Sequence, residues 1–275
     1  MQPPILISDY RVGDAIAGGS ECVNETVIQA LGCEFIRTRD IKNLDRNRRY
    51  IVANLSTART GDIVAQLSQC RYVILEHDCK FLASRHPWRY PNSVAPQEHI
   101  INRDLYKNAL ATFVQTAYHL EVFKKNGIAG RFYNLESGIW SEREIKWLTA
   151  LHGSSTIRHR EVAILDSPNW IKNKDGAIKF CEANNIDYIL IGDPNWDRFM
   201  DRLSHFSTLV FFPLAGETLC RLVVEARCIG LNVITTKNYG ATLSSWYKHR
   251  GTDLLQILTV QSSKNLEAIR LCLAN

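Results

Sequence analysis

The chain has 275 residues, of which 45% are hydrophobic and 22% are charged, and this balance is typical of a soluble globular protein. No apolar run approaches the roughly 18 residues that a membrane-spanning helix needs, and we expect no signal peptide at the short, early polar N-terminus. The formal net charge of +5 permits a polyanionic partner or an anionic membrane surface without demanding either.

The eight cysteines include no Cys-x-x-Cys pair and follow no regular spacing. Several lie in apolar runs, where a free cysteine behaves as a small buried hydrophobe. The sequence therefore predicts neither a disulfide framework nor a zinc site, and it favours the reduced cytoplasm as the compartment.

Short apolar runs alternate with amphipathic stretches along almost the whole chain. The sequence predicts strands at Ile5–Tyr10, Glu34–Thr38, Tyr50–Leu55, Tyr72–Glu76, Ala111–Gln115, Val162–Asp166, Tyr188–Ile191, Thr208–Phe212 and Asn232–Thr235. It predicts helices at Glu21–Leu31, Gly61–Ser68, Asn102–Leu110, Ala117–Asn126, Lys174–Ala183, Trp196–Ser204, Thr218–Cys228 and Ser262–Asn275. This alternation indicates an α/β fold with parallel sheets covered by helices.

A charged and polar stretch at Glu142–Arg160 is the plausible domain boundary. We expect two Rossmann-like domains, residues 1–155 and residues 156–275, with the last helix able to cross back to the first domain. Ligands of parallel sheets bind beyond the carboxyl ends of the strands. The expected site is therefore a central cleft that the two sheets face, lined by the loops after the strands.

Two loops of the first domain carry candidate residues. Gly18 and Gly19 follow the first strand and open a helix, a pattern that fits a structural turn and a phosphate-binding loop equally. His77 and Asp78 follow the fourth strand directly, where ligands bind, and a histidine there donates to a sugar hydroxyl or transfers a proton near neutral pH. In the alternative interpretation, Glu76 and Asp78 cap the next segment and His77 is merely exposed.

The segment Ser84–Pro91 interleaves cations with aromatic rings. Such a segment grips phosphates while its rings stack on bases, or it anchors at a membrane interface. The alternative is a surface loop held by its prolines. The candidate acceptor-binding residues are Lys80, Arg85, Trp88 and Arg89.

In the second domain, Lys172 and Asn173 lie between a strand and a helix. A lysine there would neutralise a diphosphate and ease its departure as an anion, although lysines are also common on surface loops.

Glu217 and Glu225 anchor the most informative run of the chain, Phe211–Ile234. It predicts a strand, a Pro/Gly turn, a helix that begins at Glu217, and a further strand after Gly230. Both carboxylates would then lie on nearly one face of the helix, and the amides at the helix mouth would favour phosphate. The alternative is a solvated helix, but the apolar helix interior argues for burial of Glu225.

These loops together resemble those of the GT-B glycosyltransferases in the large retaining family that carries the Glu-x7-Glu signature. Gly18-Gly19-Ser20-Glu21 resembles the family's Gly-Gly-x-Glu loop, and His77 falls where the family often has a histidine near the sugar. Lys172-Asn173 resembles its donor-phosphate element, and Glu217 and Glu225 match its strongest motif.

The resemblance implies that Glu217 contacts sugar hydroxyls and that Glu225 contacts the ribose of the nucleotide. It also implies that the backbone amides of Thr218, Leu219 and Cys220 face the sugar and the diphosphate. These three residues replace the family's Gly-Phe-Gly. The chain also lacks the family's arginine before the lysine, and Arg221, where an apolar residue is usual, would supply the missing positive charge.

The compact size and the Glu-His-Asp-x-Lys element at residues 76–80 also resemble small glycosyltransferases encoded by bacteriophages. Some of these enzymes attach sugars to hydroxymethylated pyrimidines in DNA. This resemblance implies DNA with modified bases as a partner and the host cytoplasm as the location.

We therefore expect a metal-independent, retaining glycosyltransferase that uses a nucleotide-diphosphate sugar, most simply a UDP-sugar, and no cofactor. The expected catalytic residues are Glu217, His77, Asp78 and Lys172. The expected donor-binding residues are Gly18, Gly19, Lys172, Asn173, Thr218, Leu219, Cys220, Arg221 and Glu225. The alternatives are a glycan- or lipid-directed transferase at a membrane surface, a nucleotide-sugar epimerase, and a catalytically silent nucleic-acid-binding module.

Overall fold

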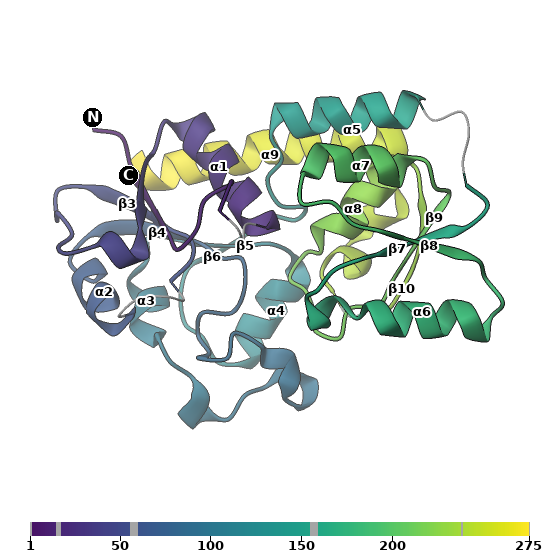
Figure 1. Cartoon of the computed structure of the whole chain (residues 1–275). Helices are drawn as coiled ribbons and strands as arrows, with labels where there is room; N and C mark the ends of the chain where they lie inside the picture. The colour runs from purple at the N-terminus through teal and green to yellow at the C-terminus, as the bar shows by residue number, and fades with distance from the viewer. Residues whose placement is uncertain (1, 15–17, 56–59, 155–158, 238, 275) are drawn as a thin grey trace. The chain divides into compact units, whose positions relative to one another are not determined.

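The chain divides into two compact units. The computed structural model describes residues 2–14, 18–55, 60–154, 159–237 and 239–274 (Figure 1). Unit 1 comprises Met1–Ser141 together with Val260–Asn275, and unit 2 comprises Glu142–Thr259. In the described ranges, no helix is long and apolar enough to span a membrane.

Unit 1 contains a six-stranded sheet in the order β2-β1-β3-β4-β5-β6, and every pairing in it is parallel. The strands are β1 (Ile5–Ser8), β2 (Glu34–Arg37), β3 (Arg49–Val52), β4 (Arg71–Leu75), β5 (Thr112–Val114) and β6 (Phe132–Asn134). The helices that begin and end in this unit are α1 (Gly19–Leu31), α2 (Thr60–Leu67), α3 (Arg103–Asn108) and α4 (Ala117–Lys125).

Successive residues of each strand enter different cores, because side chains alternate between the two faces of a sheet. Leu6, Ile51 and Val73 pack with apolar residues of α1 and of the last helix, α9 (Gly251–Ala274). Their neighbours Ile7 and Val52 pack instead with apolar residues of α2, α3 and α4. Both faces of the sheet are thus covered, as a parallel sheet requires.

The connection from β4 to α3 is the longest irregular segment of unit 1. It contains the short 3-10 turns η2 (Pro87–Arg89), η3 (Pro91–Ser93) and η4 (Gln97–His99). A further 3-10 turn, η1 (Thr38–Asp40), follows β2. Long loops at the carboxyl end of a strand are where parallel sheets place functional residues.

Unit 2 contains a four-stranded parallel sheet in the order β10-β9-β7-β8. Its strands are β7 (Val162–Leu165), β8 (Tyr188–Ile191), β9 (Thr208–Phe211) and β10 (Asn232–Thr235). Helix α6 (Lys174–Ala183) covers one face, and α5 (Glu142–Ser154), α7 (Trp196–Ser204) and α8 (Arg221–Cys228) pack together on the other (Figure 1). The 3-10 turns are η5 (Trp170–Lys172), η6 (Ala241–Leu243) and η7 (Ser245–Lys248).

The expected α/β fold with parallel sheets is confirmed, and the nine predicted strands are present. The sequence missed β6, which has three residues, and α5, whose charged residues suggested a linker. The two units divide at Ser141 and Glu142 rather than at residues 155 and 156, because α5 packs against α7 and α8. Helix α9 begins at Gly251, well before the expected start, and its residues are shared between the units.

Gly251 starts α9 with a φ of +56°, and a Cβ built on it would lie 2.6 Å from the His152 Nε2 atom. We predict that Gly251→Ala lowers the free energy of unfolding by about 1–3 kcal/mol, through backbone strain and this clash. Gly153→Ala in α5 is the matched control, since a Cβ at Gly153 meets no atom within 4 Å. The prediction would be contradicted if chemical denaturation gave equal stabilities for the two variants.

Candidate functional site

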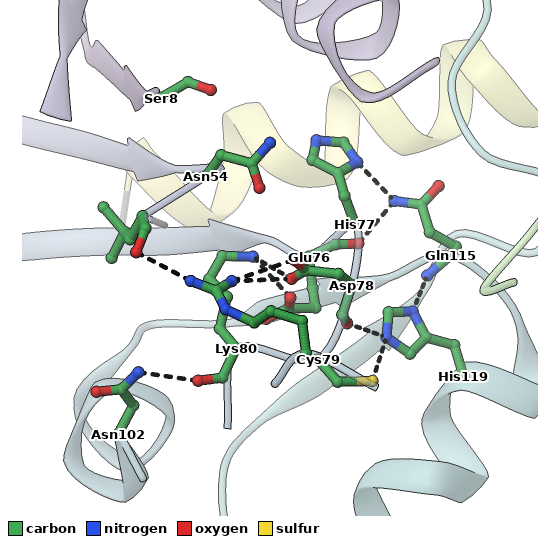
Figure 2. Close-up of polar contacts among 12 residues, drawn as sticks. Ser8, Asn54, Glu76, His77, Asp78, Cys79, Lys80, Asn102, Gln115 and His119 are labelled. Carbon is green, nitrogen blue, oxygen red and sulfur yellow. Dashed lines mark hydrogen bonds and ion pairs between the residues drawn. The ribbon is translucent and has the colours of Figure 1, made fainter. Parts of the chain in front are cut away.

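The carboxyl end of β4 carries a buried ion pair (Figure 2). Lys80 Nζ donates to Glu76 Oε1 at 2.6 Å, and the Tyr106 hydroxyl donates to the other carboxylate oxygen at 2.7 Å. Glu76 and Lys80 are both fully buried. Buried charges of this kind persist only when they are paired and hydrogen-bonded. Lys80 is therefore an internal counter-ion, which corrects the expectation that it contacts an acceptor.

The two carboxylates of this loop have opposite pKa shifts. Burial raises the pKa of Glu76 to about 7, although the Lys80 ammonium opposes that shift. Burial also acts to raise the pKa of Asp78, but the charges of Lys80 and Arg85 outweigh it and hold this pKa well below its usual range. Asp78 is thus a fixed anion at neutral pH.

Arg85 fixes the position of Asp78. Its Nη1 donates to both Asp78 carboxylate oxygens, at 3.1 and 3.2 Å, and its Nη2 donates to the Leu55 carbonyl at 2.9 Å. Arg85 does so from a left-handed backbone conformation, with a φ of +60°. Its guanidinium is engaged within unit 1, and the expectation that Arg85 contacts an acceptor stays a prediction.

Trp88 and Arg89, the other two candidates of this segment, differ in exposure. Trp88 is half-buried and packs against the core on the α2–α4 side of the sheet, whereas Arg89 is exposed. Of the four expected acceptor-binding residues, Arg89 is thus the exposed one.

His77 is held as a neutral imidazole. Its Nδ1 lies 3.4 Å from the Gln115 side-chain nitrogen, which can only donate, so Nδ1 accepts (Figure 2). Its Nε2 therefore carries the hydrogen and donates to Asn24 Oδ1 at 2.8 Å. Gln115 also donates to the Glu76 carbonyl at 2.8 Å. The loop after β4 is thus tied to the loop after β5 and to α1.

His119 is a second neutral histidine beneath the loop. Its Nδ1 accepts from the Gln115 backbone N–H at 3.2 Å, so its Nε2 donates to the Asp78 carbonyl at 2.6 Å. Burial lowers the pKa of His119 to about 4. The sequence analysis missed Gln115 and His119. Their signal was available, since Gln115 directly follows β5 at the edge of the sheet where β4 ends.

The glycine loop before α1 already holds a carboxylate. Glu21, which is buried, accepts from the Gly18 N–H at 2.7 Å and from the Ser20 hydroxyl at 2.9 Å. Gly19 is the first residue of the helix. Because this carboxylate satisfies the Gly18 amide, the observed contacts are those of a structural turn.

The structure brings Lys172 and Glu217 together in unit 2. Lys172 Nζ donates to Glu217 Oε1 at 2.6 Å. Lys172 lies in η5 beyond β7 and Glu217 in the loop beyond β9, and these strands are neighbours. Burial acts to lower the pKa of Lys172, but the Glu217 charge outweighs it and leaves this pKa raised. Lys172 therefore remains a cation at neutral pH, at the carboxyl edge of the sheet.

Asn173 has a structural role in the same loop. It adopts a left-handed conformation with a φ of +53°. Its Oδ1 accepts from the Gly176 N–H at 3.2 Å and caps α6, while its Nδ2 donates to the Phe212 carbonyl at 2.7 Å. These two bonds fix the loop that carries Lys172 against the end of β9.

Helix α8 begins at Arg221, so the expected helix start at Glu217 is wrong. The reason is Cys220, whose left-handed φ of +72° interrupts the helix before it can include Glu217. The preceding loop is held by two backbone bonds, from the Gly240 N–H to the Glu217 carbonyl at 3.0 Å and from the Ala241 N–H to the Leu219 carbonyl at 3.1 Å. Thr218, Leu219 and Cys220 are all buried in it.

Glu225 belongs to a separate buried cluster. Its Oε1 accepts from the Trp196 indole N–H at 3.2 Å and lies 3.4 Å from Arg221 Nε. Arg221 also donates to Glu144 of α5 at 2.5 Å. Burial raises the pKa of Glu225, and the Arg221 charge opposes this shift. These contacts of Arg221 lie between α5 and α8, and the expectation that it supplies charge beside Lys172 stays a prediction.

In the part of the chain that the structure describes, no group of three His, Cys, Asp or Glu side chains is arranged to hold a metal ion.

No protein-family model matches the sequence, and no curated protein matches it significantly. The fold, however, is similar to solved glycosyltransferase structures with the GT-B architecture. Sucrose-phosphate synthase from Thermosynechococcus elongatus superposes with a TM-score of 0.59 at 11% identity, over 99% of this chain and 100% of that one. Anabaena HepE, solved with UDP and glucose, superposes with a TM-score of 0.55 at 13% identity, over 99% and 92%.

The catalytic domain of Arabidopsis thaliana starch synthase IV, solved with ADP and acarbose, gives a TM-score of 0.52 at 9% identity, over 96% of this chain and 91% of that one. Together these comparisons show a GT-B α/β fold of two parallel sheets.

The strained backbone at Cys220 gives a direct test of the loop. We predict that Cys220→Gly is more stable than Cys220→Ala by about 1 kcal/mol, although glycine buries less surface, because only glycine adopts a positive φ without cost. Both variants lack the thiol, so the difference between their stabilities reports on the backbone conformation at residue 220. Urea unfolding measures it, and a more stable alanine variant would contradict the left-handed conformation.

Glu76 and His119 give opposing pH dependences. Glu76 binds its proton more tightly in the native protein than in the unfolded chain. Its contribution to the free energy of unfolding is therefore lost as pH rises from about 4.5 to 7. His119 binds its proton less tightly in the native protein than in the unfolded chain. Its contribution to the free energy of unfolding is therefore lost as pH falls from about 6.5 to 4.

We therefore predict that Glu76→Gln, which removes the first effect, makes stability rise more steeply between pH 4.5 and 6.5 than in the unmodified chain, by up to about 3 kcal/mol. Urea unfolding at a series of pH values checks this. Equal pH slopes for the two proteins would show that Glu76 does not take up a proton in this range.

Proposed function

We propose that the chain is a retaining, metal-independent glycosyltransferase that moves a sugar from a nucleotide-diphosphate sugar to a hydroxyl acceptor. The observation that carries this proposal is the pairing of Lys172 with Glu217 at the carboxyl ends of two adjacent strands. It places a cation for phosphate oxygens beside an anion for sugar hydroxyls. The similarity of the fold to glycosyltransferases solved with UDP or ADP supports it.

In this mechanism, Lys172 neutralises the charge that develops on the departing diphosphate, because its raised pKa keeps it protonated. Glu217 accepts hydrogen bonds from hydroxyls of the transferred sugar. Its side chain is one-fifth exposed, so one oxygen can turn to a ligand while the other stays on Lys172. The acceptor proton passes to the diphosphate on the face from which that group leaves.

Within unit 1, His77 and Asp78 are the proposed acceptor-orienting residues. His77 is half-buried and neutral, held between Asn24 and Gln115, and Asp78 is a fixed anion beside it. A carboxylate in this state accepts a hydrogen bond from an acceptor hydroxyl and so orients it.

We propose DNA with hydroxymethylated pyrimidines as the acceptor and a UDP-sugar as the donor. The resemblance to small phage glycosyltransferases, the net charge of +5 and the exposed Arg89 favour a polyanionic acceptor.

The test is nucleotide release from UDP-, GDP- and ADP-sugars, with and without such DNA. Release that the DNA stimulates supports both proposals. If nucleotide is released but DNA does not change the rate, the proposal of a transferase stands and the acceptor is instead a glycan or a lipid. If no donor releases nucleotide, the proposal of a transferase is refuted and a catalytically silent binding module is favoured.

We predict that Lys172→Ala lowers kcat about 100- to 1,000-fold, as expected when one electrostatic stabiliser of the transition state is removed. Lys174→Ala is the matched control, since Lys174 lies two residues further on, at the start of α6, but pairs with Asp166 at 2.8 Å. It should retain nearly full turnover in the nucleotide-release assay. Equal losses in the two variants would refute the role of Lys172 in the chemistry.

A further inference from the structure

The amino edge of the unit 1 sheet, where its strands begin, carries an excess of positive charge. Arg71 is the first residue of β4, and Arg131 directly precedes β6. Arg46 lies in the turn before β3, and Lys107 and Lys124 lie in the last turns of α3 and α4, which precede β5 and β6. These five residues are called the amino-edge surface below. It lies across the sheet from the carboxyl edge, where the proposed acceptor-orienting residues are.

The charges of the amino-edge surface are not neutralised by the protein. All five side chains are exposed, and none of them has a hydrogen-bond or ion-pair partner among the described residues. Of the carboxylates nearby, Glu34 already pairs with Arg48 at 2.8 Å, whereas Asp45 and Asp104 have no ion-pair partner in the described ranges. Five cations against two such carboxylates leave a surplus of three positive charges, more than half of the net charge of +5.

Two arginines at this edge are held side by side. Arg71 is the register partner of Arg49 on β3, and adjacent strands lie about 4.8 Å apart. Arg49 donates to the backbone carbonyls of Gln2 and Leu273, which are uncharged, and neither arginine has an ion-pair partner in the part of the chain that the structure describes. Like charges at this spacing repel each other. An anion brought to the edge would relieve that repulsion.

Backbone contacts join the other cations to the same surface. The Leu110 N–H donates to the Tyr72 carbonyl at 2.8 Å, so the start of β4 lies beside the segment between α3 and β5. A Cβ built on Gly130 would lie 2.9 Å from the Tyr106 carbonyl oxygen, so the chain just before β6 packs against α3. The cations of β4, α3 and β6 therefore belong to one continuous surface.

We infer that the amino-edge surface binds the phosphate backbone of a nucleic-acid duplex. Arginine and lysine side chains donate to phosphate oxygens whatever the base sequence. The cations follow one another along the edge from β3 to β6, so they fit a linear chain of phosphates better than a single phosphate. DNA and RNA duplexes share this chemistry. Such a contact would hold the protein on the polymer and leave the carboxyl edge of the sheet free.

An anionic membrane surface is the competing partner. Segments that dock on membranes combine cations with apolar side chains that enter the lipid. Of the large apolar side chains that are exposed in the described structure, none is a chain neighbour of the five cations. The surface therefore favours nucleic acid, and this inference takes no support from the proposed donor or acceptor.

Binding of labelled, unmodified DNA and RNA duplexes tests the inference in the absence of any sugar donor. Fluorescence anisotropy gives the affinity over a series of salt concentrations, and each phosphate contact contributes about 0.9 to the slope of log affinity against log salt. We expect Arg71→Gln, Lys107→Gln and Arg131→Gln each to weaken binding and to reduce that slope by about 0.9. The duplex that binds more tightly identifies the source of the backbone.

Lys179→Gln is the matched control for Lys107→Gln. Lys179 is also an exposed lysine of a helix, α6, without a partner among the described residues, but it lies in unit 2. Its substitution removes the same charge and should leave the salt slope unchanged. All the substituted side chains are exposed, so the variants should fold as the unmodified chain does.

Three results would overturn the inference. In the first, neither duplex binds even at low salt. In the second, the Lys179 variant loses as much of the slope as the other variants, so that only the net charge matters. In the third, vesicles of equal parts phosphatidylserine and phosphatidylcholine bind more tightly than either duplex, and the surface is a membrane site. None of these results bears on nucleotide release from sugar donors, so failure here is distinct from failure of the proposed function.

Discussion

Each buried charged side chain at the end of β4 lies next to a side chain of opposite charge. Burial of Glu76 is tolerated because Lys80 and Tyr106 each donate a hydrogen bond to one of its carboxylate oxygens. Asp78 stays ionised because the cations of Lys80 and Arg85 lie beside it. These four charged residues share the segment after β4. Parallel sheets also bring the loops after several strands to one edge, and Lys172 and Glu217 meet in this way beyond β7 and β9.

Whether a charged side chain can contact a ligand depends on whether its ion pair is buried or keeps solvent-exposed surface. Lys80 and Arg85 are neutralised inside unit 1, and their effect is indirect: they fix Asp78 as an anion. Lys172 and Glu217 also neutralise each other, but both side chains keep solvent-exposed surface. A ligand can therefore reach this pair and exchange its contacts, which a fully buried pair does not permit.

The sequence predicted the sheets well, because buried parallel strands are continuous apolar runs that differ from their polar surroundings. It also predicted which loops carry polar residues, since His77 and Glu217 follow strands directly. It did not predict the contacts within those loops. Lys80 and Arg85 look like any surface cations in a sequence, and only the fold shows that each is directed at a carboxylate. Cys220 gave no sign of its left-handed conformation, because that conformation comes from the loop's tertiary bonds.

Helix α5 changes how two features of the sequence are understood. The charged start of α5 was interpreted as a linker, although Ile145, Leu148 and Leu151 follow helical spacing. Without α5, Glu144 had no place in the fold, and Arg221 had no visible partner. The absence of the family's arginine before Lys172 then suggested that Arg221 supplies the missing positive charge. Once α5 packs on α8, Glu144 and Glu225 both lie against Arg221, and the arginine is explained by the folding of unit 2. Lys172 is thus the cation that the described structure leaves accessible beside Glu217.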